Sequence, residues 1–166
     1  GKRDTHFTLN QENQLILLLG LGKDPDYRQV ESTFRRVLIK HSSLIEKEIF
    51  LDFPDSISDS LTEAALVGFQ LGTYSIGFFK KDPPKSFKKH RVSIRIPSST
   101  PKNLAFSAQK IAEAKMEAFR LVDLPPNKIT PPNLADWAKN LAKRLNLGVK
   151  VFDPKRAKSE GLEAFL

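Results

Sequence analysis

Two proline pairs constrain the fold of this chain more than any other sequence feature. They lie in the segment from Phe119 to Trp137, FRLVDLPPNKITPPNLADW. Pro125 and Pro126 have no backbone N–H to donate and push the residue before them out of the helical region, so a helix must end there. Thr130 followed by Pro131 supplies a capping residue and a proline at the start of the next helix. The sequence therefore predicts two helices joined by a fixed hinge.

The first two-thirds of the chain alternates patterns typical of strands and helices. Residues 14–19, QLILLL, form an unbroken apolar run that predicts a strand buried on both faces of a parallel-type sheet. Residues 48–53 and the alternating residues 92–96 predict two further strands. Apolar spacing of three and four residues predicts helices over 27–38, 60–74 and 103–122. Strands joined through helices indicate an α/β layered domain.

Small residues mark the predicted helix 60–74. We expect them to let this helix lie close to the sheet, because glycine and alanine carry little or no side chain. The residues are Ala64, Ala65, Gly68 and Gly72.

Composition narrows the functional classes. The chain has no cysteine, which excludes disulfides and thiolate metal sites and fits a reducing compartment. No apolar run approaches the roughly 20 residues that cross a bilayer, so we expect no membrane partner. The start GKRDTHFTLN lacks the apolar segment of a signal peptide, although a leader upstream stays open.

Three local motifs resemble chemical sites, and a structural interpretation is favoured for each. Gly20-x-Gly22 lacks the third glycine of a nucleotide-binding turn, and the following KDPD indicates a turn and a helix cap. The acidic residues Asp52, Asp55 and Asp59 lack the alternate spacing of a calcium loop, so we expect Asp55 and Asp59 to stabilise a helix start. Ser75 misses the nucleophile elbow by one residue.

The three histidines have no partner at the four-residue spacing that places two metal ligands on one helical face. They are His6, His41 and His90, and we expect them to be surface or packing residues. The residues therefore supply no catalytic and no metal-binding candidates.

A basic stretch follows the second predicted helix and contributes much of the formal net charge of +8. Its candidate nucleic-acid contacts are Lys85, Lys88, Lys89 and Arg91. Such a patch binds phosphates by counterion release, which gives weak and salt-sensitive binding to DNA. Prolines interrupt the stretch, and a solvated linker is the favoured interpretation.

The hinge and two other segments carry a resemblance to a known family. The pattern N-x-x-T-P between two helices, GFQLGTYSIGFFK at 68–80, and the order of elements from Asn140 to Leu166 resemble the leucyl aminopeptidases. Phe119 and Arg120 stand where that family usually has Arg and Asp, and Asp123 stands where it usually has Asn. These departures do not move the proline pattern.

The resemblance implies a domain organisation. Residues 1–102 would form most of an N-terminal α/β domain with a macro-domain-like layered sheet, incomplete at its start. Residues 103–124 would form a long connecting helix. Residues 125–166 would begin the catalytic domain with a helix and a strand, Val149 to Phe152.

The resemblance also implies a function. The parent would be a cytoplasmic hexamer that uses two divalent metal ions, Mn or Zn, to release N-terminal residues from peptides. The family's metal-binding motifs would lie beyond Leu166, so this chain alone would be inactive and would serve assembly and positioning. The alternative is a stand-alone macro-like module that binds ADP-ribose-type nucleotides or nucleic acid.

Overall fold

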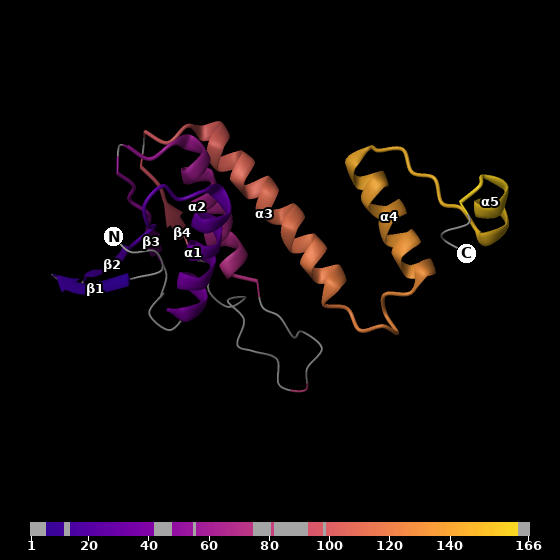
Figure 1. Ribbon diagram of the computed structural model, residues 1–166, viewed down its shortest axis with the longest axis horizontal. Coiled ribbons are helices and arrows are strands. Elements are labelled where there is room, and N and C mark those ends of the chain that lie inside the picture. The colour runs from indigo at the N-terminus through magenta and orange to yellow at the C-terminus, as the bar shows by residue number, and fades with distance from the viewer. Residues whose placement is uncertain are drawn as a thin grey trace. The chain divides into compact units, whose positions relative to one another are not determined.

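The computed structural model describes residues 6–11, 14–41, 48–54, 56–74, 81, 93–97 and 99–162. The chain forms two compact units, Gly1–Asp123 and Leu124–Leu166. Figure 1 shows the helices and strands of each unit. The two units are described separately below.

The first two strands form an antiparallel hairpin (Figure 1). β1 (His6–Gln11) pairs with β2 (Gln14–Leu19), with Phe7 opposite Leu18. The prediction of a strand buried on both faces of a parallel-type sheet is therefore wrong. The reason is that an apolar run does not specify its partner, and here the partner is the segment immediately before it, which only an antiparallel turn can reach. One face of the hairpin is left uncovered, and the Leu18 side chain is 53% exposed.

The parallel pairing occurs elsewhere in this unit. β3 (Glu48–Phe50) runs parallel to β4 (Ser93–Arg95), and Leu51 N donates to Arg95 O over 2.9 Å just after the pair. Both strands are shorter than predicted. Within the described residues the strands form two separate two-stranded sheets, and α2 lies in the connection between β3 and β4.

α1 (Tyr27–Lys40) begins at the turn that the KDPD sequence predicts. Gln29 N donates to Asp26 Oδ1 over 2.8 Å, and Asp26 N donates to Gln29 Oε1 over 3.2 Å. This reciprocal arrangement is a capping box, which satisfies two N–H groups at the helix start. The buried face of α1 is apolar at helical spacing and includes Val30, Phe34 and Leu38.

α2 (Asp59–Gly72) is an almost completely buried helix whose start is capped by Ser58, as Leu61 N donates to Ser58 Oγ over 3.4 Å. Its glycines face α1. A Cβ atom built on Gly68 would lie 2.1 Å from Glu31 O, and one on Gly72 would lie 2.8 Å from Leu38 Cβ. For Gly68 and Gly72 the expected close approach to the sheet is corrected, since both glycines permit a close approach between two helices.

α3 (Lys102–Val122) completes the core of the first unit by packing on α2. Its fully buried residues are Ala108 and Ala112. Partly buried side chains of α3 that border the same core are larger, namely Leu104, Ile111, Met116 and Phe119. The core is thus a stack of three helices bordered by short strands (Figure 1).

The second unit contains α4 (Pro131–Leu145) and α5 (Pro154–Ser159). The end of α3 at Val122 and the start of α4 at Pro131 confirm the helix boundaries that the two proline pairs predict. Thr130 occupies the capping position of α4, but its side chain makes no capping hydrogen bond. α4 ends at Asn146, which adopts a left-handed conformation with φ of 54°.

The strand predicted at Val149 to Phe152 is not formed. Residues 149–152 have no regular secondary structure, and among the residues described in this unit no strand lies beside them. A single strand has no backbone hydrogen-bond partners of its own, so alternating valines alone do not produce one. α5 follows this segment, capped by Asp153 through a 2.8 Å hydrogen bond from Arg156 N.

Candidate functional site

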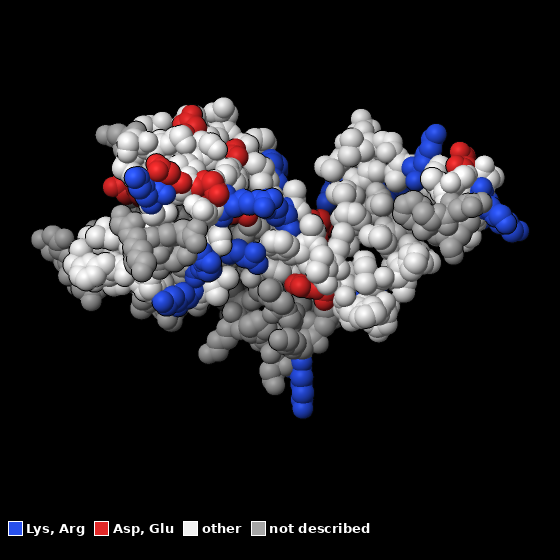
Figure 2. Space-filling model, viewed as in Figure 1, with Lys and Arg blue, Asp and Glu red and all other residues white. Residues whose placement is uncertain are grey.

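The residues predicted to contact nucleic acid are Lys85, Lys88, Lys89 and Arg91, and all four lie outside the described residues. Their binding to phosphates stays a prediction. On the face of the first unit drawn in Figure 2, basic and acidic side chains are interspersed.

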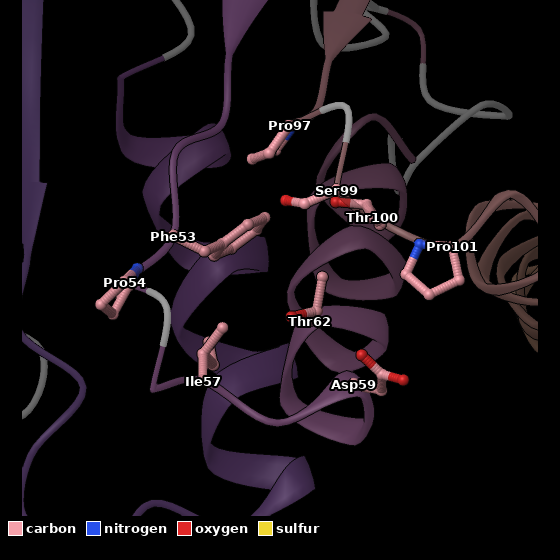
Figure 3. Close-up of a pocket in the computed structure, with 9 residues that line it drawn as sticks. All are labelled: Phe53, Pro54, Ile57, Asp59, Thr62, Pro97, Ser99, Thr100 and Pro101. Carbon is pink, nitrogen blue, oxygen red and sulfur yellow. The ribbon is translucent and has the colours of Figure 1, made fainter.

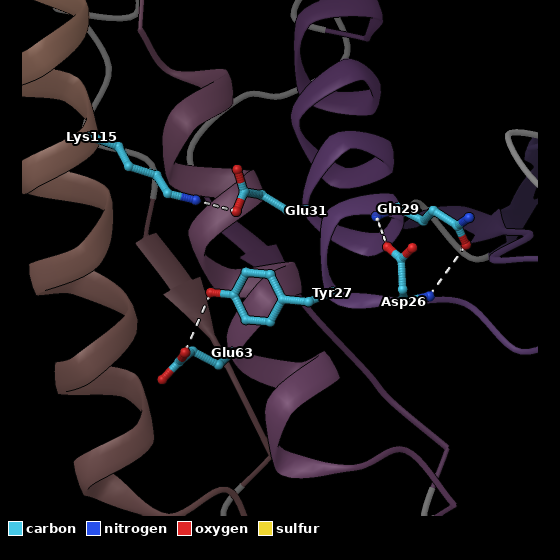
Figure 4. Close-up of polar contacts among 6 residues, drawn as sticks. All are labelled: Asp26, Tyr27, Gln29, Glu31, Glu63 and Lys115. Atoms are coloured by element: carbon cyan, nitrogen blue, oxygen red, sulfur yellow. Dashed lines mark hydrogen bonds and ion pairs between the residues drawn. The ribbon is translucent and has the colours of Figure 1, made fainter.

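Polar side chains connect the three helices of the first unit (Figure 4). The Glu63 carboxylate on α2 accepts a 3.3 Å hydrogen bond from Tyr27 Oη of α1. It also accepts a 2.8 Å hydrogen bond from Ser107 Oγ of α3. Lys115 of α3 forms an ion pair with Glu31 of α1. Each helix therefore contributes to a junction of opposite charges and hydroxyl groups at the edge of an apolar core. Sequence analysis missed this junction, because its members are far apart in the chain.

A second polar contact lies near the C-terminal end of α3. Tyr74 Oη donates to Asp123 Oδ2 over 2.5 Å. The Tyr74 ring lies 5.5 Å from the Phe119 ring, and the Arg35 guanidinium lies 4.8 Å from the centre of the same phenylalanine. These contacts attach the end of α3 to the end of α2 before the hinge.

Both tyrosines of the chain are in these clusters, and their environments raise their pKa values. Burial, followed by the charges of Glu63 and Glu31, raises the pKa of Tyr27 to about 12. Burial, followed by the hydrogen bond to Asp123, raises the pKa of Tyr74 to about 12. Both phenols keep their protons in the folded state under conditions where free tyrosine, with a pKa of about 10, ionises.

We therefore expect the folded protein to bind tyrosine protons that the unfolded chain releases between about pH 10 and pH 12. This contribution to stability is fully present below pH 10 and is lost as pH rises through 12. Ultraviolet absorbance of the phenolate measures it directly, since the chain has only two tyrosines. The native midpoint should lie near 12, and the midpoint in denaturant near 10. A Tyr27→Phe variant should leave one such transition, from Tyr74, and a native midpoint near 10 would contradict this account.

An open hollow of about 230 Å³ lies where the chain leaves β3 and β4 (Figure 3). Phe53 and Ile57 line it after β3, Ser99 and Thr100 line it after β4, and Asp59 and Thr62 line it from the first turns of α2. The carboxyl end of parallel strands is the usual position for ligands in α/β sheets. The Thr62 hydroxyl, however, already donates its proton to Ser58 O over 3.2 Å and does not offer it to a ligand in the hollow.

The structure describes part of the three local motifs that resemble chemical sites. Gly22, with φ of 92°, and Asp24, with φ of 50°, form the turn before α1, which confirms the turn-and-cap interpretation. At the start of α2 the capping oxygen comes from Ser58, while Asp59 is the first helical residue and supplies negative charge there. Asp52 is exposed, and Asp55 and Ser75 lie outside the described residues.

The side chains of two of the three histidines contact each other. The His6 ring, at the start of β1, and the His41 ring, at the C-cap of α1, lie 4.6 Å apart with an edge-to-face angle of 77°. His41 Nε2 is buried and has no hydrogen-bond partner among the described residues. Burial, followed by the nearby His6 and Lys40, lowers the pKa of His41. Sequence spacing gave no signal for this pair, because sheet pairing and helix packing bring it together.

Larger groups of metal-ligating side chains are not found in the described part of the chain. No three or more histidine, aspartate or glutamate side chains come together there in a way that would hold a metal ion. Among the same residues, no helix has the length and apolar character to span a bilayer.

Proteins of similar sequence are named cytosol aminopeptidases. The chain is 30% identical over 160 residues to the probable cytosol aminopeptidase of Geobacter sp. (strain M21), a match that covers 91% of this chain and 32% of that protein. It is 29% identical over 150 residues to the Mycobacterium marinum protein, covering 88% and 29%. It is 27% identical over 171 residues to the Clostridium perfringens protein, covering 96% and 34%. The chain spans about a third of the length of these relatives, and no family model matches it.

Solved structures share the fold. A mutant of tomato leucine aminopeptidase matches with a TM-score of 0.78 at 22% identity, over 96% of this chain and 34% of that chain. The bottromycin maturation enzyme BotP in complex with Mn matches with a TM-score of 0.72 at 19% identity, over 96% and 34%. The fold of this chain is therefore similar to about a third of each of these chains.

The sequence and fold comparisons together confirm the resemblance that the hinge indicates. The chain is similar in sequence and fold to the N-terminal region of leucyl aminopeptidases.

Proposed function

We propose that this chain is the N-terminal portion of a metal-dependent aminopeptidase that releases N-terminal residues from peptides. In this proposal the described residues serve assembly and positioning, and the chemistry belongs to the remaining two-thirds of the relatives' length. The parent would act in the cytoplasm as a hexamer. Its first unit would derive from a macro-like layered domain.

The coverage of the matches is the observation that supports this proposal most strongly. Almost the whole chain matches the cytosol aminopeptidases, yet it matches only about a third of each. Exposed apolar side chains in the second unit give further support. Leu134 and Leu145 of α4, and Val149 and Val151 after it, are exposed, as expected of side chains that pack on further parts of the same polypeptide.

The proposal that the parent enzyme uses metal ions is supported by a solved structure similar to this chain. One neighbour is described as a complex with Mn. Two divalent ions, manganese or zinc, would bind the substrate and activate a water in the parent enzyme. Within this chain, the described residues would hold neither of those two ions, because they bring together no ligand cluster of the required size.

Activity of the isolated chain tests this division of roles. We expect no release of leucine from a leucine amide by the purified 166-residue chain, with or without added Mn²⁺ or Zn²⁺. The positive control is the intact Clostridium perfringens relative, assayed in the same buffers. Turnover that elutes with the chain and is abolished by a chelator would place catalytic residues within it and overturn the proposed roles.

A chimera tests the proposed role in assembly separately. The chain would replace the matched N-terminal region of the same relative, with the junction placed after α5. Restored oligomer formation, compared with the relative lacking that region, supports a role in assembly. A chimera that behaves like the truncated relative in size and activity would count against it.

A further inference from the structure

The histidine pair of the first unit suggests a site that the aminopeptidase comparison does not assign. We propose that His6 and His41 bind a late first-row divalent cation, such as Zn²⁺ or Ni²⁺, between them. Such an ion would join the β1–β2 hairpin to the C-terminal end of α1. This inference is independent of the proposed function.

The spacing of the two rings fits a shared ion. With a metal–nitrogen bond of about 2.0–2.1 Å, an imidazole centre lies roughly 3.2 Å from the metal. Two such rings then have centres roughly 4.5 Å apart at a right angle and roughly 5.2 Å apart at the tetrahedral angle. The observed separation of 4.6 Å falls at the near end of this range. The separation of the ring centres is therefore compatible with a shared ion, which requires each ring to turn one nitrogen toward a common point.

Available nitrogens are the second requirement. His41 Nε2 is buried and accepts no hydrogen bond from the described residues, so no described donor competes for its lone pair. Buried polar atoms are ordinarily paired, and an unpaired one needs a physical explanation. A bound cation would supply a partner for this nitrogen, because a neutral imidazole has one nitrogen that can accept or ligate.

The backbone fixes both rings independently of each other. His6 is opposite Leu19 in the hairpin register, and the Leu19 side chain packs against the core, which places His6 on the same face. His41 is held at the end of α1, where its N–H donates to Val37 O over 2.9 Å. A site supported from two elements loses little freedom when a ligand binds.

Charge opposes binding but does not prevent it. The ammonium of Lys40 lies close enough to His41 to disfavour a further positive charge. Two imidazoles are nevertheless good ligands for nickel, copper and zinc and poor ligands for magnesium or calcium, which prefer oxygen. We therefore expect selectivity for the late transition metals, with affinity well below that of a four-ligand structural site.

Calorimetric titration of the full chain with Zn²⁺ and, separately, Ni²⁺ tests the site. The expected result is one saturable equivalent for each ion and no heat from Mg²⁺. His6→Phe and His41→Phe, which keep a ring in the contact, should each weaken binding by about tenfold or more. The matched control is His90→Ala, the third histidine of the chain, which should bind as the wild type does.

Three outcomes would overturn the proposal. These are no binding by the wild type, wild-type affinity in either phenylalanine variant, and loss of binding in the His90→Ala control. Because phenylalanine could disturb folding, circular dichroism of each variant is recorded first. A thermal melt with and without Zn²⁺ then gives a second measurement, in which the wild type should melt higher with the ion and the two variants should not.

Discussion

Replacing Gly68 with alanine should lower the stability of the first unit by about 2–3 kcal/mol. The new Cβ would lie 2.1 Å from the carbonyl oxygen of Glu31, so α1 and α2 would have to separate. Overpacking typically costs about 1–3 kcal/mol and occasionally more, and a clash with a backbone carbonyl belongs at or above the upper end of that range, whereas the better helix propensity of alanine returns only about 1 kcal/mol. The steric cost therefore decides the sign.

Urea unfolding, followed by a probe in the first unit, measures this loss of stability. Tyr27 and Tyr74 both lie in the first unit, so in a Trp137→Phe background tyrosine fluorescence follows the unfolding of that unit. The matched control is Gly148→Ala, because a Cβ there would meet nothing within 4 Å. That variant should unfold at the wild-type urea concentration. Equal midpoints for Gly68→Ala and the wild type would show that α1 and α2 do not approach as closely as described.

The second unit should open far more readily than the first. Ala142 is the only residue of α4 that is buried, whereas α2 is buried along nearly its whole length. Large apolar side chains of the second unit are exposed, including Leu145 at 54% and Leu147 at 61%. A short helix in water depends on packing of its apolar face, and this face is poorly covered. We expect backbone amides of α4 to exchange on the order of a hundredfold or more faster than those of α2.

Hydrogen exchange at several protein concentrations tests this difference. Association through the exposed apolar face would slow exchange in α4, so the comparison is made at the dilution where the chain is monomeric. Trp137 fluorescence gives an independent measurement, since the only tryptophan of the chain lies in α4. Equal protection of α4 and α2 in a monomer would mean that Leu124–Leu166 is a self-sufficient domain, and the proposal of a partial enzyme would lose its physical basis.

Local sequence signals predicted α1 to α4, whereas α5 was not predicted. The proline pairs predicted the end of α3 and the start of α4, and the KDPD sequence predicted the capped start of α1. These predictions succeeded because a missing N–H group or a capping carboxylate acts on its immediate neighbours. The apolar face of α1 likewise follows directly from residue spacing.

The sequence predicted poorly which strands pair and which helices pack against one another. The run QLILLL was expected in a parallel-type sheet and forms an antiparallel hairpin, and Gly68 was expected to face a sheet and faces α1. An apolar run or a glycine indicates that another element packs closely against it, but it does not identify that element. The contacts of Glu63 and the meeting of His6 with His41 depend on the same information. Such contacts could be anticipated only after the arrangement of the helices was known.

The parallel pairing of β3 with β4 has a consequence for the order of folding. The pair closes a segment running from Glu48 to Ser93, and α2 lies within that segment. Closing so long a segment costs entropy before only three residue pairs are gained. We therefore expect α1 and α2 to associate first and the two strands to join late. Conservative substitutions at Ile49 or Ile94 should then accelerate unfolding while leaving the folding rate almost unchanged.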